Sequence, residues 1–208
     1  EHQWRARDVR VEEHELASMS ARLTSLKELD AARAEYGSAA RLLLAQSGGS
    51  FSHLGSVADH LEVDRGHERA VEACLGELLQ CIVVNRWLDV TAGIEIAKSE
   101  NAGRCGFLVA EAADPEASIA TPPDPALQPL RELVRINGPG ASAVRRLLAR
   151  RWLAPSLEAA EAAAKTTDDQ ITTPEGIVLE GRLMAHSGGK REALGILATK
   201  GEIKEIGR

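Results

Sequence analysis

The sequence contains an internal repeat, which restricts the chain to folds built from two similar halves. Residues 57–75 and residues 130–148 align without a gap at a constant offset of 73. The matched positions are apolar in both copies: Val57 with Leu130, Val63 with Ile136, Ala70 and Val71 with Ala143 and Val144, and Leu75 with Leu148. Such a repeat predicts two lobes related by a local two-fold axis, although amphipathic helices also align by chance.

The stretch between the two copies breaks the pattern of regular elements. Five of the eight prolines lie here, at positions 115, 122, 123, 125 and 129. Proline fixes φ and lacks a backbone N–H, so no regular element is expected at this density. We therefore predict a Pro-rich linker at 114–129, between a first lobe at 36–113 and a second lobe at 130–189.

Both ends of the chain have the pattern of helical arms. Residues 1–35 contain neither proline nor glycine, and their apolar residues follow a heptad spacing: Val9, Leu16 and Leu23 on one seam position, with Met19 and Leu26 on the other. Residues 190–208 follow a double glycine and show the same kind of seam: Ile196, Ile203 and Ile206. The pattern predicts two coiled-coil arms, and the alternative for the first is an amphipathic helix packed on the body.

Within the lobes, apolar spacing and capping residues predict an α+β fold. In the first lobe we expect helices at 39–45, 65–80 and 87–98 and strands at 81–84 and 105–110, with Asp64 and Asn85 as helix caps. In the second lobe we expect a helix at 157–165 and a short strand at 177–179, whereas 151–155 has too few apolar residues for more than a weak strand.

Composition and charge exclude several broad classes of protein. The formal net charge of −6 argues against nucleic-acid binding over the whole surface, but it leaves room for a local basic patch. Three cysteines without a CxxC pair indicate reduced thiols in a cytosolic protein. No apolar run is long enough to span a bilayer and no signal peptide is visible. Since the chain starts without an initiator Met, we expect it to be a fragment of a longer protein.

The spacing of glycines around Lys190 does not match a phosphate-binding loop. Gly188, Gly189 and Lys190 resemble the end of such a loop, which also needs an earlier glycine and a Ser or Thr after the lysine. Met184 and Arg191 occupy those two positions, so we expect no nucleotide site here.

Metal and catalytic sites are not supported either. His53, His60 and His67 are seven residues apart, but no HExxH motif accompanies them and Gly55 interrupts any helix between them. We expect these rings to face solvent rather than a metal. No GxSxG elbow and no catalytic set of titratable residues is present, so the sequence predicts no enzyme activity and no cofactor.

One cluster of basic residues stands out from the rest of the chain. Arg145, Arg146, Arg150 and Arg151 fall on one predicted helix. A run of this kind is either a solvated helix face or a patch that contacts phosphate groups.

Several short motifs together are specific for one family. They are Leu54–Asp59 with Leu61–Val63, Glu68 with Ala70–Glu72, Leu75–Gly76, Leu79–Val84, Gly103–Arg104 with Phe107–Leu108, Thr173–Gly176 and Ser187–Glu192. Combined with two lobes, a Pro-rich linker and an arm at each end, they make the chain resemble the hinge domain of a bacterial SMC (structural maintenance of chromosomes) protein. The resemblance covers nearly all of the sequence.

The resemblance implies a closed two-fold homodimer in which each lobe of one subunit meets the opposite lobe of its partner. It places Gly181, Gly188 and Gly189 at the dimer interface, where glycine allows backbones to approach closely. The sequence departs from the family pattern at Leu183 and Met184, where a further glycine pair is common. We therefore expect the dimer to form with contacts of its own at this position.

The function implied by the resemblance is mechanical. The hinge would join two subunits of a chromosome-organising protein into a ring or rod that holds DNA, in the cytoplasm at the nucleoid. The two arms would pair antiparallel within one chain, and ATP would be hydrolysed only by heads that lie outside this chain. Weak, non-specific DNA binding is expected at Lys190 and Arg191, and the second candidate is the cluster described above: Arg145, Arg146, Arg150 and Arg151.

Two other classes of function stay open at this stage. One is a two-lobed small-molecule-binding or enzymatic domain with helical extensions, which paired titratable groups in a cleft would favour. The other is a coiled-coil spacer with no role at DNA.

Overall fold

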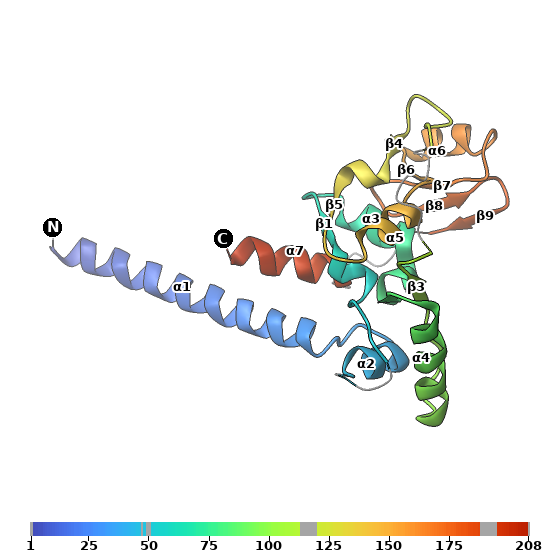
Figure 1. Cartoon of the computed structure of the whole chain (residues 1–208). Helices are drawn as coiled ribbons and strands as arrows, with labels where there is room; N and C mark the ends of the chain where they lie inside the picture. The colour runs from blue at the N-terminus through green and yellow to red at the C-terminus, as the bar shows by residue number, and fades with distance from the viewer. Residues whose placement is uncertain (1, 47, 49–50, 113–119, 188–194, 208) are drawn as a thin grey trace.

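The computed structural model describes residues 2–46, 48, 51–112, 120–187 and 195–207. A mixed α+β body carries two helices, α1 (His2–Ala31) and α7 (Ile196–Ile206), which project from the same side of it (Figure 1). No helix in these ranges is both long enough and apolar enough to cross a membrane. The predicted site residues Gly188, Gly189, Lys190 and Arg191 lie outside the described residues.

The internal repeat is visible in the order of elements. The first copy comprises η1 (Val57–His60), β1 (Leu61–Val63) and α3 (Glu68–Leu75). The second comprises η3 (Leu130–Leu133), β5 (Val134–Ile136) and α5 (Ala141–Leu147), and each of its elements begins 73 residues after its counterpart. The offset read from the apolar pattern is therefore also the offset between equivalent structural elements.

Strand β1 pairs antiparallel with its own equivalent, β5. Glu62 and Arg135, the central residues of the two strands, face each other in this ladder, with Leu61 opposite Ile136 and Val63 opposite Val134. An antiparallel pair of equivalent strands is symmetric about its midpoint, so a local two-fold axis passes between Glu62 and Arg135.

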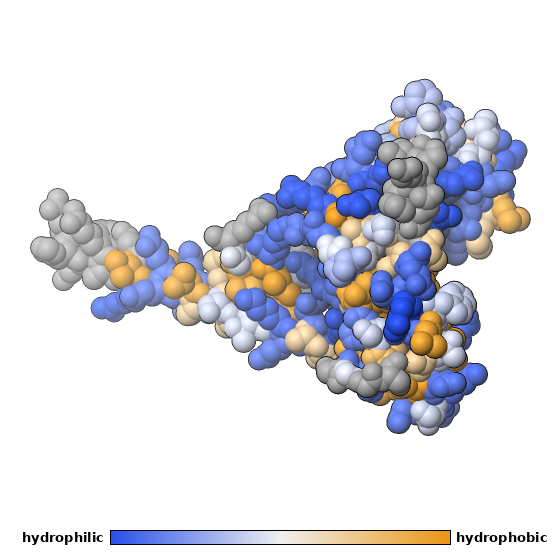
Figure 2. Space-filling model, viewed as in Figure 1, coloured by the Kyte–Doolittle hydropathy of each residue, from blue (hydrophilic) through white to orange (hydrophobic). Residues whose placement is uncertain are grey.

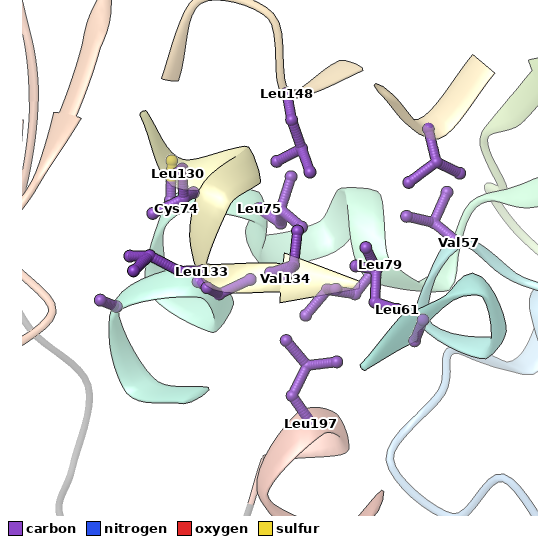
Figure 3. Close-up of a cluster of buried hydrophobic side chains, with 14 of the residues drawn as sticks. Val57, Leu61, Cys74, Leu75, Leu79, Leu130, Leu133, Val134, Leu148 and Leu197 are labelled. Atoms are coloured by element: carbon purple, nitrogen blue, oxygen red, sulfur yellow. The ribbon is translucent and has the colours of Figure 1, made fainter. Parts of the chain in front are cut away.

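The two copies share one hydrophobic core (Figure 3). Its fully or nearly fully buried side chains come from both copies and from the residues just after the first: Val57, Leu61, Val71 and Leu75, then Leu79, and Leu130, Leu133, Val144 and Leu148. Leu197 of α7, only 2% exposed, enters the same core. The second arm is thus anchored in the body rather than attached to its surface.

The first lobe adds a small parallel sheet to this core. Strands β2 (Ile82–Val84) and β3 (Phe107–Val109) pair in parallel, connected through α4 (Trp87–Ser99). With α2 (Ser38–Leu44) they enclose a second cluster of buried side chains: Leu43, Phe51, Ile82, Val84, Val90 and Ala97.

Helix positions in the first lobe differ from the sequence prediction in two respects. The helix expected at 65–80 is α3 followed by the 3-10 helix η2 (Gly76–Gln80), because Gly76 at the end of α3 adopts a φ of 50° and interrupts the α-helical path. The N-cap positions are His67 for α3 and Arg86 for α4, so the predictions of Asp64 and Asn85 as caps were wrong.

The second lobe contains a five-stranded sheet in the order β4-β6-β7-β8-β9. Its strands are β4 (Gln128–Pro129), β6 (Arg151–Leu153), β7 (Gln170–Thr172), β8 (Val178–Glu180) and β9 (Met184–His186), and α6 (Leu157–Ala163) connects β6 to β7. The strand at 151–155 predicted to be weak is an inner strand of this sheet. It is stabilised by Trp152, which is fully buried and donates from Nε1 to Asp169 Oδ2 at 2.8 Å. The predicted linker also ends in a strand, since Gln128 and Pro129 pair with β6.

Candidate functional site

The tight turn between β8 and β9 depends on Gly181. This residue has a φ of 52°, and a Cβ added to it would lie 2.7 Å from the Asp168 carboxylate, which leaves no space for a side chain. The turn folds β9 back along β8 with Glu180 opposite Met184. Gly181 itself is buried, so it shapes the hairpin from the inside, and the exposed surface at this turn belongs to the residues that follow it.

Strand β9 forms one outer edge of the five-stranded sheet. All three of its residues, Met184 to His186, are exposed. Leu183, in the turn just before it, is 92% exposed. In Figure 2 an apolar spot marks the right edge of the body, where Figure 1 places the outer end of this hairpin. A free strand edge next to exposed apolar side chains is typical of a surface that pairs with another chain.

Strand β3 leaves a second edge open, in the first lobe. It pairs with β2 on one side, and within the described ranges no strand pairs with its other side. In the second lobe the equivalent parallel pair is β6 and β7, and there β8 lies antiparallel beside β7. The first lobe therefore lacks the neighbour that the second lobe has.

A cluster of charges fixes both arms to the first lobe at Asp59. Arg33, just after α1, places its guanidinium Nη2 at 2.8 Å from Asp59 Oδ2, and Lys200 of α7 places Nζ at 2.9 Å from Asp59 Oδ1. Lys200 also lies 3.1 Å from Asp30 of α1. One carboxylate thus binds a cation from each arm, and the arms are bridged to each other at the same point.

The position of Asp59 is set by Ser56, the N-cap residue of η1. Ser56 and Asp59 form a capping box in which each side chain binds the other residue's backbone N–H. Ser56 also shares a 2.9 Å hydrogen bond with the buried hydroxyl of Tyr36. Burial opposes ionisation of Asp59, but the hydrogen bond from Arg33 and the charge of Lys200 outweigh it and hold the pKa of Asp59 well below its usual range.

The arms run antiparallel where they meet. Asp30 lies beside Lys200, and Arg22, earlier in α1, forms an ion pair with Glu202, later in α7. On α1 the buried seam residue is Leu26, which is 6% exposed, whereas Leu16, ten residues earlier in the helix, is 73% exposed. The expected pairing of the arms within one chain is therefore present close to the body.

The predicted arginine cluster does not form one basic face. Arg145 and Arg146 lie on α5, but Arg150 follows that helix and Arg151 lies in β6. Arg150 is bound to Asp169 at 2.6 Å, and Arg151 donates to Gln170 at 2.8 Å. Of the four arginines, Arg145 and Arg146 are the two that are exposed and form no ion pair with a described side chain. The prediction of one helix was wrong because α5 ends at Leu147.

The histidines also differ from expectation. His60 is 3% exposed, its Nδ1 lies 2.9 Å from the Ser56 carbonyl oxygen, and its ring packs against Gly138 and Gly140. His53 and His67 are half-buried, so the prediction of solvent-facing rings was wrong. In the part of the chain that the structure describes, no group of three or more His, Cys, Asp or Glu side chains could hold a metal ion.

Comparison with known families identifies the fold. The family described as SMC proteins Flexible Hinge Domain matches residues 51–164, which is more than half of the 208 residues. The chain belongs to the SMC hinge family. The match runs from just before η1 to the end of α6, so it includes both copies of the repeat and the parallel pair of β2 and β3 with its open edge. No curated protein matches this SMC hinge in a direct sequence comparison.

Solved structures agree with this assignment. The hinge is similar to the Geobacillus stearothermophilus SMC hinge domain, described as an asymmetric dimer, with a TM-score of 0.82 and 21% identity over 94% of this chain and 82% of that one. The Pyrococcus furiosus Smc hinge with an extended coiled coil gives a TM-score of 0.63 and 22% identity over 96% and 73%. The S. pombe Smc5/6 hinge gives a TM-score of 0.54 and 15% identity, over 86% of this chain and 75% of that one. Bacterial, archaeal and eukaryotic hinges all match, so these similarities support the family without favouring the expected bacterial source.

Sequence reasoning missed the Asp59 cluster. Its signal was the spacing of Ser56 and Asp59, a capping-box pattern at the start of a short helix. The partners Arg33 and Lys200 lie 26 and 141 residues away from Asp59 and could not be assigned from the sequence.

Proposed function

We propose that this chain is the dimerisation hinge of a chromosome-organising SMC protein and joins two subunits through the free edges of β3 and β9. Each protomer carries the β3 edge in its first lobe and the β9 edge in its second lobe, where β4 forms the opposite end of the sheet. If the lobes of two protomers meet crosswise, the β9 edge of one lies beside the β3 edge of the other, and the two-fold operation makes the same contact again.

The observation that carries the proposal is the missing neighbour of β3. Unpaired N–H and C=O groups along a strand edge favour pairing with a further strand, and such edges cause aggregation unless they are covered. A partner strand in the place that β8 occupies beside β7 would satisfy them. The Geobacillus stearothermophilus hinge, which has the same fold, is described as a dimer.

The arms support the mechanical part of the proposal. Because α1 and α7 leave the body on the same side and run antiparallel, an SMC protein containing this hinge would fold back at this point into one coiled coil. Two such subunits joined at their hinges would form the ring or rod that holds DNA. Weak DNA binding near the junction of body and arms, at Lys190 and Arg191, belongs to the same proposal.

Sedimentation equilibrium of the whole chain at micromolar concentration tests dimerisation. The expected result is a mass twice that of the 22.3 kDa chain. A chain that stays monomeric up to about 100 µM would contradict the proposal, because a contact weaker than roughly 5 kcal/mol could not hold two subunits together.

A further inference from the structure

We propose that Trp87 and Leu88 of one protomer pack against Leu183 and Met184 of its partner, and that this apolar contact closes each of the two strand-edge junctions. The inference rests on the proposed dimer and names the side chains that complete it. Trp87 and Leu88 form the lobe 1 pair, and Leu183 and Met184 form the lobe 2 pair.

The lobe 1 pair is exposed although its residues are large and apolar. Trp87 is 67% and Leu88 66% exposed at the start of α4. The equivalent helix of the second lobe, α6, begins with Leu157, which is only 37% exposed and is followed by Glu158. An exposed Trp next to an exposed Leu, in a chain with only three Trp, is typical of a surface covered by a partner.

Hydrogen bonds place the lobe 1 pair at the C-terminal end of β3. Glu111, two residues after that strand, donates its backbone N–H to the Asn85 carbonyl oxygen at 3.0 Å. Its carboxylate accepts the backbone N–H of Trp87 at 2.8 Å. Trp87 is therefore fixed next to the point where the open edge of β3 ends.

The direction in which β9 would pair with β3 decides which residues meet. In the second lobe the strand beside β7 is antiparallel to it, and a partner strand beside β3 in the same arrangement would also be antiparallel. The N-terminal end of β9, Met184 with Leu183 before it, then lies at the C-terminal end of β3. Antiparallel pairing of β9 with β3 therefore brings the lobe 2 pair next to the lobe 1 pair. Parallel pairing would instead bring the lobe 2 pair to Phe107, at the N-terminal end of β3.

The area required for a stable dimer supports the same contact. Specific protein interfaces bury about 1,200–2,000 Å² in total, and two edges of three residues each supply hydrogen bonds but little apolar area. An aromatic side chain alone can bury about 150–250 Å². Two-fold symmetry makes the contact occur twice, so the two apolar pairs add the area that the strand edges lack.

Charged substitutions in the whole chain test the contact. Trp87→Lys and Leu183→Glu each place a charge against an apolar partner surface at both junctions, and each should raise the dimer dissociation constant about tenfold or more in sedimentation equilibrium. An equimolar mixture of the two variants forms heterodimers with one native junction and one in which the introduced charges attract. The mixture should therefore dimerise more tightly than either variant alone.

Leu157→Glu is the matched control. It changes the equivalent position of the second lobe and should leave the dissociation constant unchanged. Both test residues are exposed in the protomer, so circular dichroism should show unchanged melting of the monomer. Dimerisation of both variants as tight as in the wild type, or a mixture no tighter than its components, overturns this inference while the hinge dimer stands. A monomeric wild type overturns the proposed function itself.

Discussion

The carboxylate of Glu72 on α3 lies directly over the backbone of Gly195 and accepts the N–H groups of Ile196 and Leu197 in the first turn of α7. Gly195 occupies the N-cap position without providing a side-chain cap, so a residue from the body caps the arm. Burial raises the pKa of Glu72, and the two N–H groups oppose this effect. The start of the second arm is therefore defined by the body.

Gly195→Ala should destabilise the chain, because a Cβ at this position would overlap the Glu72 carboxylate and displace it from both N–H groups. The expected loss is about 1 kcal/mol, the usual effect of losing a helix cap, measured by urea denaturation. Gly201→Ala is the control: it lies inside α7 with no atom closer than 3.5 Å to its added Cβ, and it should stabilise by about 0.5–1 kcal/mol. If the two substitutions changed the free energy of unfolding equally, Glu72 would not be the cap of α7.

Asp59→Asn should weaken the attachment of both arms by about 2 kcal/mol at pH 7, since Arg33 and Lys200 would lose their shared anion. Because the folded pKa of Asp59 lies below the unfolded value of about 4, its contribution is complete above that pH and is lost as the pH falls toward the folded value. Urea denaturation at pH 7, 4 and 2.5 should therefore show the free energy of unfolding of the wild type falling toward that of the variant. Asp64→Asn, which breaks an exposed pair with Arg135, should cost less than about 0.5 kcal/mol at every pH. If the difference in free energy of unfolding between the wild type and Asp59→Asn stayed constant with pH, ionised Asp59 would not be what holds the arms.

Leu26→Asp should separate the arms near the body, because this side chain is 6% exposed and a buried unpaired charge is costly. We expect a loss of about 3 kcal/mol and faster proteolysis within α1. Leu16→Asp, at a residue that is 73% exposed, should change stability by less than about 0.5 kcal/mol. If α1 were cleaved by protease at similar rates in both variants, packing of Leu26 would not be what holds the arms together.

Lys190→Glu combined with Arg191→Glu should abolish retention of duplex DNA in a low-salt shift assay and leave the dimer intact. For three or four phosphate contacts, affinity should fall roughly as the third power of salt concentration. Arg145→Glu combined with Arg146→Glu is the comparison, since these residues are exposed on α5. Loss of binding only in the second variant would move the contact to the second lobe, and no binding by the wild type would remove DNA from the proposal.

The repeat could be predicted from the sequence because it rests on local spacing. The positions of Val57, Val71 and Leu75 follow helical and strand periodicities that their partners at Leu130, Val144 and Leu148 share. The same reasoning underestimated β6, because a three-residue strand gives little periodicity, and its place in the sheet depends on the fully buried Trp152 with its hydrogen bond to Asp169.

The arm attachments could not be predicted, because they depend on contacts between distant residues. Leu197 has the pattern of an arm residue but packs in the shared core, and Lys200 resembles any exposed lysine of a helix until Asp59 is placed beside it. His60 is buried for a similar reason, since the turn at Gly138 and Gly140 comes from the other copy of the repeat. Periodicity predicts which face of an element is apolar, but not which element covers it.

The pairing of β1 with β5 also determines which halves can associate. By the same geometry the first half of one molecule could pair β1 with β1 of another molecule. Such a swapped pair would set Glu62 against Glu62, and like charges directly opposite in a ladder are unfavourable. In this chain Glu62 faces Arg135 instead, so opposite charges at the centre of the ladder favour the intact chain over exchange of halves between molecules.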